Sequence, residues 1–359
     1  MNYEYYNTVL NVLKIFGLSS LAFFIGIFLT PLLTHYLYKY GMWRKEKKEY
    51  ALDGSRLEVY RNLKKDDAKK VPRVGGVLIW SVVFSVAMIF WILAAVFPGE
   101  FTQKINFLSR SQTWLPLFIL MAASFVGLAD DLMQIYGSGK FISGGMRLSR
   151  RLLLIGLISL GGAYWFYFKL GMDSVFIPFL GEVFIGWLLM PLFILVMLAA
   201  FSGGVIDGLD GLSGGVLASA FGAYAGIAYA QNQIDLAAFC GVIIGALLAF
   251  LWFNIPPARF YMGETGIMGM TAVLTAVAFL TDAVLVLPII ALPLVLASGS
   301  VIIQVLSKKL RNGKKVFLVA PLHHHFEAKG WPPYKVTMRF WVIGVIFAVI
   351  GMVIALMGR

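Results

Sequence analysis

Two adjacent carboxylates, Asp130 and Asp131, stand at the end of a short apolar run in the string VGLADDLMQ. Neighbouring carboxylates repel each other, and the C-terminal end of a helix dipole disfavours acidic groups. A divalent cation would offset both effects, because Mg²⁺ is typically held by one or two carboxylates together with substrate phosphates. The alternative is a solvated helix end at which the aspartates pair with Arg150 or Arg151.

A second acidic pair, Asp207 and Asp210, lies in the glycine-rich string GGVIDGLDGLSGG. With a spacing of three residues, both carboxylates would share one face of a helical turn. The glycines allow the backbone to approach a ligand and expose its N–H groups, as phosphate-binding loops require. No GK[ST] follows, so this is not a Walker loop. A flexible turn with aspartate helix caps is the alternative.

A third acidic residue, Glu264, lies in WFNIPPARFYMGETG, just before a predicted helix. Helix capping alone would also favour a carboxylate at this position. Phe260 and Tyr261 could offer a stacking face for a base, and Arg259 a cation for phosphate. The string therefore predicts either a capped helix or a nucleotide-binding segment.

Three consecutive histidines, His323, His324 and His325, follow in APLHHHFE. Three neighbours cannot easily point at one ion, so we do not expect a His₃ zinc site. Imidazoles near a diphosphate can donate hydrogen bonds and offset charge, which is the interpretation we favour. A polar loop that caps its own helix ends is the alternative.

Composition places these motifs in a bilayer. The 359 residues are 60% hydrophobic and only 13% charged, against about 45–50% apolar and about 25% charged in soluble domains. The one cysteine excludes an internal disulfide and a Cys-based metal site. Channels and carriers place ionisable groups near mid-membrane, whereas these motifs stand at the ends of the apolar runs. This placement favours chemistry at the membrane surface.

We predict an all-α polytopic membrane protein that forms a single domain over residues 1–359, with about ten transmembrane helices. The ninth contains Pro288 and Pro293, so we expect it to be kinked or broken. Residues 173–185 alternate enough for a small β-hairpin. The ten apolar runs lie near 16–37, 75–97, 114–129, 152–168, 186–203, 213–230, 234–253, 265–281, 283–306 and 337–357.

The basic residues predict the orientation. Loops on one face, counted through to the helix ends, hold 25 of the 30 Lys and Arg, with eight between Lys308 and Arg339. By the positive-inside rule this face is cytoplasmic and both termini lie outside the cell membrane. We therefore assign the net charge of +12 to topology rather than to nucleic acid. Attraction of anionic lipid headgroups or phosphorylated substrates is a further interpretation of the same charges.

Taken together, the motifs resemble the bacterial phospho-N-acetylmuramoyl-pentapeptide transferases, within the polyprenyl-phosphate N-acetylhexosamine-1-phosphate transferase superfamily. The strings that carry the resemblance are KKVPRVGG (69–76), ADD (129–131), DGLDGL (207–212), LWFN with FYMGETG (251–266) and APLHHHFEAKGW (320–331). The resemblance covers nearly the whole chain. It implies Mg²⁺-dependent transfer of phospho-MurNAc-pentapeptide from its UDP carrier to undecaprenyl phosphate, giving lipid I and UMP. It also implies a cytoplasmic active site and a homodimer.

The resemblance further implies roles for individual residues. Asp130 and Asp131 match the catalytic acidic pair, Glu264 matches the metal-binding carboxylate, and the three histidines match the catalytic triple histidine. We expect Glu264 and one of the two aspartates to hold the metal across the diphosphate, while the other aspartate orients or deprotonates the lipid phosphate. Arg151 would neutralise developing charge.

The remaining matches imply substrate contacts. Lys69 matches a lysine on the nucleotide side, Asp207 and Asp210 the acids of DGLDG, and Asn254 the asparagine of LWFN. Tyr261 matches an aromatic residue that stacks on uracil.

The chain departs from the family pattern at several positions. Glu264 stands where the family usually has Asp, and PRVGG replaces PTMGG. Phe201, Gly204 and Ile206 stand in place of two asparagines and a threonine, and Gln134 in place of a lysine. These departures leave three alternatives: a sister transferase for GlcNAc-1-phosphate or a similar sugar, a non-catalytic relative, and a secondary transporter or lipid flippase.

Overall fold

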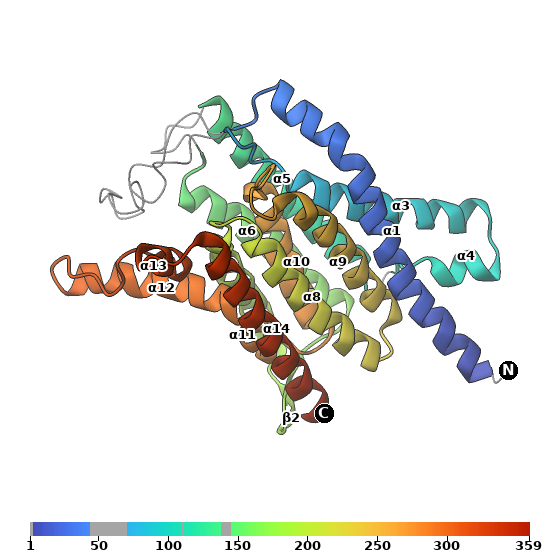
Figure 1. The fold of residues 1–359 in the computed structure, drawn as a ribbon. Coiled ribbons are helices and arrows are strands. Elements are labelled where there is room, and N and C mark those ends of the chain that lie inside the picture. Colours follow the sequence, from blue (N-terminus) through green and yellow to red (C-terminus); the bar gives the residue numbers. More distant parts are fainter. Residues whose placement is uncertain (1–2, 44–69, 110, 138–144) are drawn as a thin grey trace.

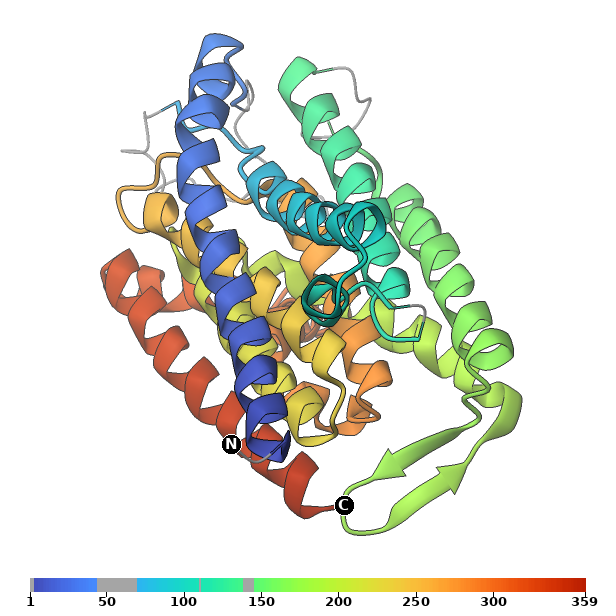
Figure 2. The same ribbon diagram turned by 90° about the vertical axis from the view of Figure 1, so that its right-hand side faces the viewer.

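The computed structural model describes residues 3–43, 70–109, 111–137 and 145–359, with side chains from residue 7 onward. Within these ranges, ten helices are long and apolar enough to cross a membrane, as predicted. Both termini lie at the same end of the helical bundle (Figures 1 and 2), as an even number of spans requires.

The long helices are α1 Tyr3–Lys39, α3 Val77–Val96, α5 Trp114–Tyr136, α6 Leu148–Tyr164, α7 Leu189–Ser202, α8 Leu212–Ala230, α9 Ile234–Asn254, α10 Gly263–Leu280, α12 Leu292–Leu310 and α14 Pro333–Met357. Short helices are α4 Glu100–Ile105, α11 Leu287–Ile290 and α13 Leu322–Ala328. Brief 3₁₀ or π segments cover Trp165–Lys169, Gly186–Leu188, Gly203–Ile206 and Val284–Val286.

Helix α10 forms the centre of the bundle, since 94% of its spanning window is buried. It packs against α5 through small residues that let the two backbones approach closely. A Cβ added at Gly127 of α5 would lie 2.1 Å from the carbonyl oxygen of Glu264, and one at Gly269 of α10 would lie 2.0 Å from Ser124 Oγ. This close crossing brings the C-terminal part of α5 against the N-terminus of α10.

The ninth apolar run is broken, as predicted. A 3₁₀ turn and α11 end at Ala291, whose φ of −104° and ψ of 32° interrupt the helix before α12 begins. Pro288 and Pro293 each lie in the first turn of a segment, where a missing N–H costs no helical hydrogen bond.

The predicted hairpin is also confirmed. Strands β1 Ser174–Ile177 and β2 Gly181–Phe184 pair antiparallel, with Ser174 opposite Phe184. Figure 2 shows the hairpin reaching the C-terminus, and the N–H of Phe179 in its turn donates to the carbonyl of Gly358.

The predicted end of the third span is wrong. Helix α5 does not stop near residue 129 but continues to Tyr136 and ends at Gly137, which has a left-handed φ of 66°. Asp130 and Asp131 therefore lie inside the helix, and both are fully buried. The helix continues because residues from other segments compensate the two carboxylates.

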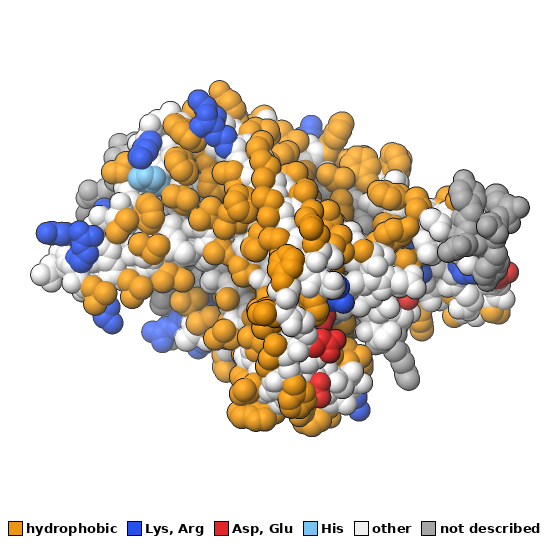
Figure 3. All heavy atoms as spheres, turned by 90° about the horizontal axis from the view of Figure 1, so that it is seen from below, with side chains coloured by type: hydrophobic (Ala, Val, Ile, Leu, Met, Phe, Trp, Pro, Cys, Tyr) orange, Lys and Arg blue, Asp and Glu red, His pale blue; other side chains and the backbone are white. Residues whose placement is uncertain are grey.

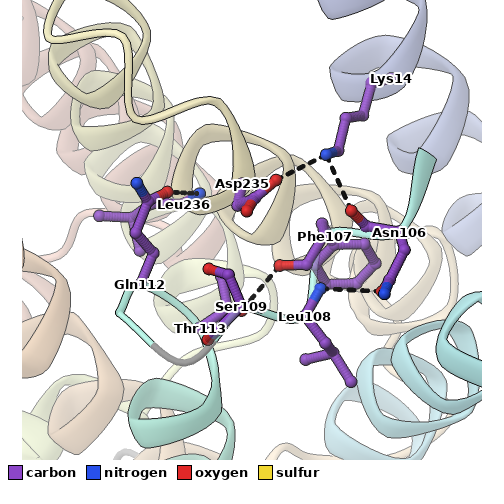
Figure 4. Close-up of polar contacts among 9 residues, drawn as sticks. All are labelled: Lys14, Asn106, Phe107, Leu108, Ser109, Gln112, Thr113, Asp235 and Leu236. Carbon is purple, nitrogen blue, oxygen red and sulfur yellow. Dashed lines mark hydrogen bonds and ion pairs between the residues drawn. The ribbon is translucent and has the colours of Figure 1, made fainter. Parts of the chain in front are cut away.

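A separate polar cluster joins α1, the start of α9 and the segment that follows α4 (Figure 4). Lys14 of α1 donates to Asp235 of α9 at 2.6 Å and to the carbonyl of Asn106 at 3.0 Å. The Lys14 side chain is 8% exposed and that of Asp235 27%. The ion pair ties α1 to the start of α9, and the hydrogen bond to Asn106 ties α1 to the segment that follows α4.

Candidate active site

Arg151 joins two carboxylates that are far apart in the sequence. Its Nη2 lies 2.6 Å from Asp130 Oδ2, and its Nη1 lies 2.8 Å from Glu264 Oε1. The three residues come from α6, α5 and the first turn of α10. The structure therefore brings the predicted acidic residues together at one end of the bundle.

Asp130 has partners on both of its oxygens. Besides Arg151, Oδ2 accepts a hydrogen bond from Gln134 Nε2 at 2.7 Å, and Oδ1 accepts one from the N–H of Met146 at 2.5 Å. The pairing with Arg151 matches one of the two interpretations of this sequence, but the helix end is buried rather than solvated. These contacts fix the orientation of Asp130.

Asp131 differs from its neighbour because one of its oxygens has no partner. Oδ2 accepts the N–H of Thr265 at 2.9 Å, at the N-terminus of α10. Oδ1 is buried and makes no hydrogen bond within the part of the chain that the structure describes. Leaving a buried carboxylate oxygen unpaired is costly, so this atom fits a bound cation.

The residues present fit a Mg²⁺ ion whose coordination shell is completed by water and by the phosphates of the substrate. Among the described residues, no group of three or more His, Cys, Asp or Glu side chains could hold a metal ion by itself. Mg²⁺ does not require one, since one or two carboxylates with water and substrate phosphates complete its shell. Asp131, with its unpaired oxygen, and Glu264, at the start of the adjacent helix, are the candidate ligands.

Arg73 and Gly263 lie beside these carboxylates. The charge of Arg73 acts on both Asp131 and Asp207. Gly263 has a φ of +71°, and a Cβ there would lie 1.9 Å from the carbonyl of Arg73 and 2.6 Å from Asp131 Oδ2. A residue with a side chain at position 263 would therefore push the segment PRVGG (72–76) away from Asp131. The sequence had given Arg73 no role.

The glycine-rich loop does not form the helical turn that its spacing suggested. Asp207 and Asp210 follow the 3₁₀ segment Gly203–Ile206 and precede α8, and Gly211 has a left-handed φ of 75°. The two carboxylates have different partners. Asp207 accepts from Ser213 Oγ and the N–H of Gly263, whereas Asp210 accepts from the N–H of Ala258.

Burial raises the pKa of the Asp207 carboxyl, while the Ser213 hydroxyl and the charge of Arg73 oppose this rise. Its contact with Gly263 ties the glycine-rich loop to the start of α10. The loop is thereby fixed beside the acidic cluster.

Asn254 connects the loop to the segment before α10. Its Oδ1 accepts the N–H of Gly211 at 2.9 Å, and its Nδ2 donates to the carbonyl of Phe260 at 2.8 Å. Phe260 is fully buried against Phe250 and Phe253, so the expected stacking face cannot include it. Tyr261 is half-buried and pairs through its backbone with Pro72 and Gly75. Its contact with a base stays a prediction, and Lys69 lies outside the described residues.

Two of the three histidines face the glycine-rich loop from α13. A Cβ added at Gly208 would lie 2.5 Å from His323 Nε2 and 2.8 Å from His324 Nε2. His324 Nδ1 pairs with the carboxylate of Glu327, a partner that the sequence analysis missed although its i,i+3 spacing on a helix could have indicated it. His325 turns away, since its Nδ1 accepts the N–H of Leu318.

The fold and the site define a helical membrane protein with an acidic site at one end of its bundle, and a family comparison places it among the transferases. The family model described as glycosyl transferase family 4 matches residues 113–282, which run from the start of α5 past the end of α10. All the carboxylates described above except that of Glu327 fall within this range.

Curated relatives refine this class. The chain is 34% identical over 343 residues to a phospho-N-acetylmuramoyl-pentapeptide-transferase of Lactiplantibacillus plantarum, covering 94% of this chain and 98% of the relative. It is 32% identical to the corresponding transferase of Pelagibacter ubique, covering 96% and 94%, and 35% identical to that of Geobacillus thermodenitrificans, covering 79% and 83%. The chain belongs to the phospho-N-acetylmuramoyl-pentapeptide-transferase family, which confirms the resemblance drawn from its motifs.

Proposed function

We propose that this protein transfers phospho-N-acetylmuramoyl-pentapeptide from UDP-MurNAc-pentapeptide to undecaprenyl phosphate, forming lipid I and releasing UMP in peptidoglycan synthesis. The observation that carries the proposal is the convergence of Asp130, Asp131 and Glu264 around Arg151 at one end of a ten-span bundle. A lipid phosphate and a water-soluble nucleotide sugar can meet only at such a surface. The family of the chain supplies the identity of the sugar.

Phosphoryl transfer leaves a protein mainly the tasks of positioning two anions and offsetting the charge that develops between them. Mg²⁺ held by Asp131 and Glu264 would neutralise charge on the donor diphosphate. Arg151 contacts Glu264 directly, and Asp130, whose oxygens are both engaged, holds Arg151 in place. Asp130 is thus a positioning residue in this proposal.

Two of the histidines, His323 and His324, lie against the glycine-rich loop at Gly208. Because Glu327 holds Nδ1 of His324, the Nε2 atom of His324 is directed toward Gly208. A carboxylate that orients an imidazole in this way stabilises its protonated form. His324 would therefore donate a hydrogen bond to a phosphate oxygen that lies over the loop.

We further propose that the site faces the cytoplasm, that both termini lie outside, and that the protein forms a homodimer. The excess of Lys and Arg on the loops at the site end of the bundle supports this orientation. The homodimer rests on the family resemblance alone.

The test is release of UMP by purified protein. The donors are UDP-MurNAc-pentapeptide and UDP-GlcNAc, each with undecaprenyl phosphate, in Mg²⁺ or in EDTA. We expect UMP only from UDP-MurNAc-pentapeptide and only with Mg²⁺. Release from UDP-GlcNAc alone would assign the protein to the sister transferases, and transport into vesicles without UMP would assign it to the carriers.

A further inference from the structure

The C-terminal half of α12 and the chain that returns from it form an extension of the bundle, which we call the arm (residues 300–320). Helix α12 leaves the bundle at a wide angle to α14 (Figure 1). Only 33% of the spanning window of α12 is buried. Its large apolar side chains are therefore mostly exposed, and they include Ile302, Ile303, Leu306 and Leu310, the last of which is 77% exposed.

The arm is held together by polar side chains along its inner face. Gln304 accepts the N–H groups of Val316 and Phe317 through Oε1 and donates to the carbonyl of Phe317 through Nε2, at 2.8–3.0 Å. Ser307 Oγ donates to the carbonyl of Lys314 at 2.9 Å. The spacing of Gln304 and Ser307 puts both on one side of α12. The returning chain is thus fixed against the helix, which makes the arm a defined element.

The end of the arm, residues 308–315, carries a concentrated positive charge. Five of its eight residues are Lys or Arg, and no Asp or Glu occurs between Asp282 and Glu327. Figure 3 shows Lys and Arg side chains gathered at the left-hand end of the molecule, the side on which α12 ends in Figure 1. The five are Lys308, Lys309, Arg311, Lys314 and Lys315.

Four of these cations have no partner of opposite charge within the described part of the chain. No ion pair there involves Lys309, Arg311, Lys314 or Lys315, and all four side chains are exposed. The end of the arm also points away from the ends of α5 and α10 that form the candidate active site (Figure 1). These charges therefore do not belong to the acidic cluster.

We propose that residues 308–315 bind the headgroups of anionic phospholipids in the leaflet on the side of the candidate active site. The exposed apolar face of the arm fits hydrocarbon, and the cations directly beyond it fit the depth of the phosphates. A soluble acidic protein would complement the charge but not the apolar face that leads to it. Only a lipid surface complements both the apolar face and the positive charge of the arm.

The expected contribution is large enough to measure. Each basic residue near an acidic surface adds about 1 kcal/mol, which corresponds to roughly fivefold in affinity. Four independent cations would contribute several hundredfold, and we expect at least tenfold because neighbouring charges share the same lipids. The attraction must weaken at high salt, because exposed charges are screened.

The experiment compares variants of the full chain in neutral-detergent micelles. In one variant Lys309, Arg311, Lys314 and Lys315 are all changed to Gln, and in the matched control the three lysines are changed to Arg. The probes are dioleoyl phosphatidylglycerol and dioleoyl phosphatidylcholine. Bound lipids are counted by native mass spectrometry, and the unfolding temperature is followed as lipid is added. Lys169, which is exposed at the end of the π segment after α6, is changed to Gln as a control for the loss of a cation elsewhere on the protein.

We expect the unaltered protein and the arginine control to bind phosphatidylglycerol in preference to phosphatidylcholine, and the glutamine variant to lose at least tenfold of this affinity. Unchanged phosphatidylglycerol binding by a folded glutamine variant, or equal binding of both lipids by the unaltered protein, overturns the proposal. If the quadruple variant does not fold, Lys314→Gln with Lys315→Gln in the returning chain makes the same comparison, with an expected loss of at least fivefold.

The acceptor lipid is also an anion, so it needs its own measurement. With phosphatidylglycerol saturating, we expect the KM for undecaprenyl phosphate to be the same in the glutamine variant and the arginine control. A raised KM with unchanged phosphatidylglycerol binding would assign the cations to the acceptor and overturn the proposal. The lipid counts require no activity, so the inference can hold or fail independently of the proposed function.

Discussion

Arg151 is the cation on which the packing of the acidic cluster depends. It contacts Asp130, which is fully buried, and Glu264, whose side chain is 25% exposed. Replacing it with Gln removes the charge but keeps a hydrogen-bond donor of shorter reach. Two carboxylates would then face each other at the crossing of α5, α6 and α10 without the cation that joins them. We expect Arg151→Gln to destabilise the fold as well as the site.

The burial of Asp130 and Arg151 sets the loss of unfolding free energy that we expect in Arg151→Gln. Removing one partner of a buried ion pair costs about 3–5 kcal/mol, because the other charge stays buried without compensation. Arg151 keeps 19% exposure, and Gln134 and the N–H of Met146 still bind Asp130, so we expect about 3 kcal/mol. Asp130→Asn removes the uncompensated charge. The double variant should therefore be about 2 kcal/mol more stable than the sum of the two single costs.

The assay is equilibrium unfolding in mixed micelles for the unaltered protein, the two single variants and the double variant. Arg151→Lys serves as the control, because it keeps the charge but cannot contact two carboxylates at once. It should lie between the unaltered protein and Arg151→Gln. Additive costs within about 0.5 kcal/mol would refute the reasoning, because they would show that Asp130 and Arg151 do not interact energetically.

Three further predictions concern the metal ligands, the Lys14 ion pair and Asp282. Asp131→Asn and Glu264→Gln should each abolish UMP release and the rise in unfolding temperature that we expect Mg²⁺ to produce, whereas Glu264→Asp should keep both. A rise with Mg²⁺ that survives in both amide variants would exclude these ligands. Lys14→Met should lower the unfolding free energy by about 2 kcal/mol, because it leaves the Asp235 carboxylate without its cation. The double variant with Asp235→Asn should lose less, and an equal or larger loss in the double variant would contradict this coupling. Burial raises the pKa of the Asp282 carboxyl, so stability should fall as pH rises above the ordinary value of 3.8. Asp282→Asn, which tolerates the local φ of 48°, should flatten that fall in unfolding measured between pH 4 and pH 7; an unchanged slope would contradict the burial argument.

The elements that the sequence predicted are those set by local patterns. Apolar runs located the ten spans, the two prolines located the break before α12, and alternation over 173–185 located the hairpin. These features depend on hydrophobic length and on φ restrictions, which are properties of neighbouring residues. The convergence of the acids at one end of the bundle also followed, since each motif stood at an end of its span.

The predictions were wrong where residues from other segments determine the length of a helix or the environment of a side chain. Helix α5 passes through Asp130 because Arg151 and Met146, from another segment, compensate the charge. Phe260 is buried because Phe250 and Phe253 of α9 cover it, which its position beside Arg259 did not indicate. The partners of Asp207 and Asp210 likewise come from residues 213, 258 and 263. No local pattern contains these contacts.

The two adjacent aspartates show how environment separates residues of the same type. Asp130 meets a cation, an amide and a backbone N–H, and these contacts engage both of its oxygens. One helical position further, Asp131 meets the N-terminus of α10, where the dipole and a backbone N–H favour its charge but engage only one oxygen. A cation that enters the site therefore finds an available oxygen on Asp131 and not on Asp130. In the proposed function, this difference makes Asp131 the metal ligand and Asp130 the positioning residue.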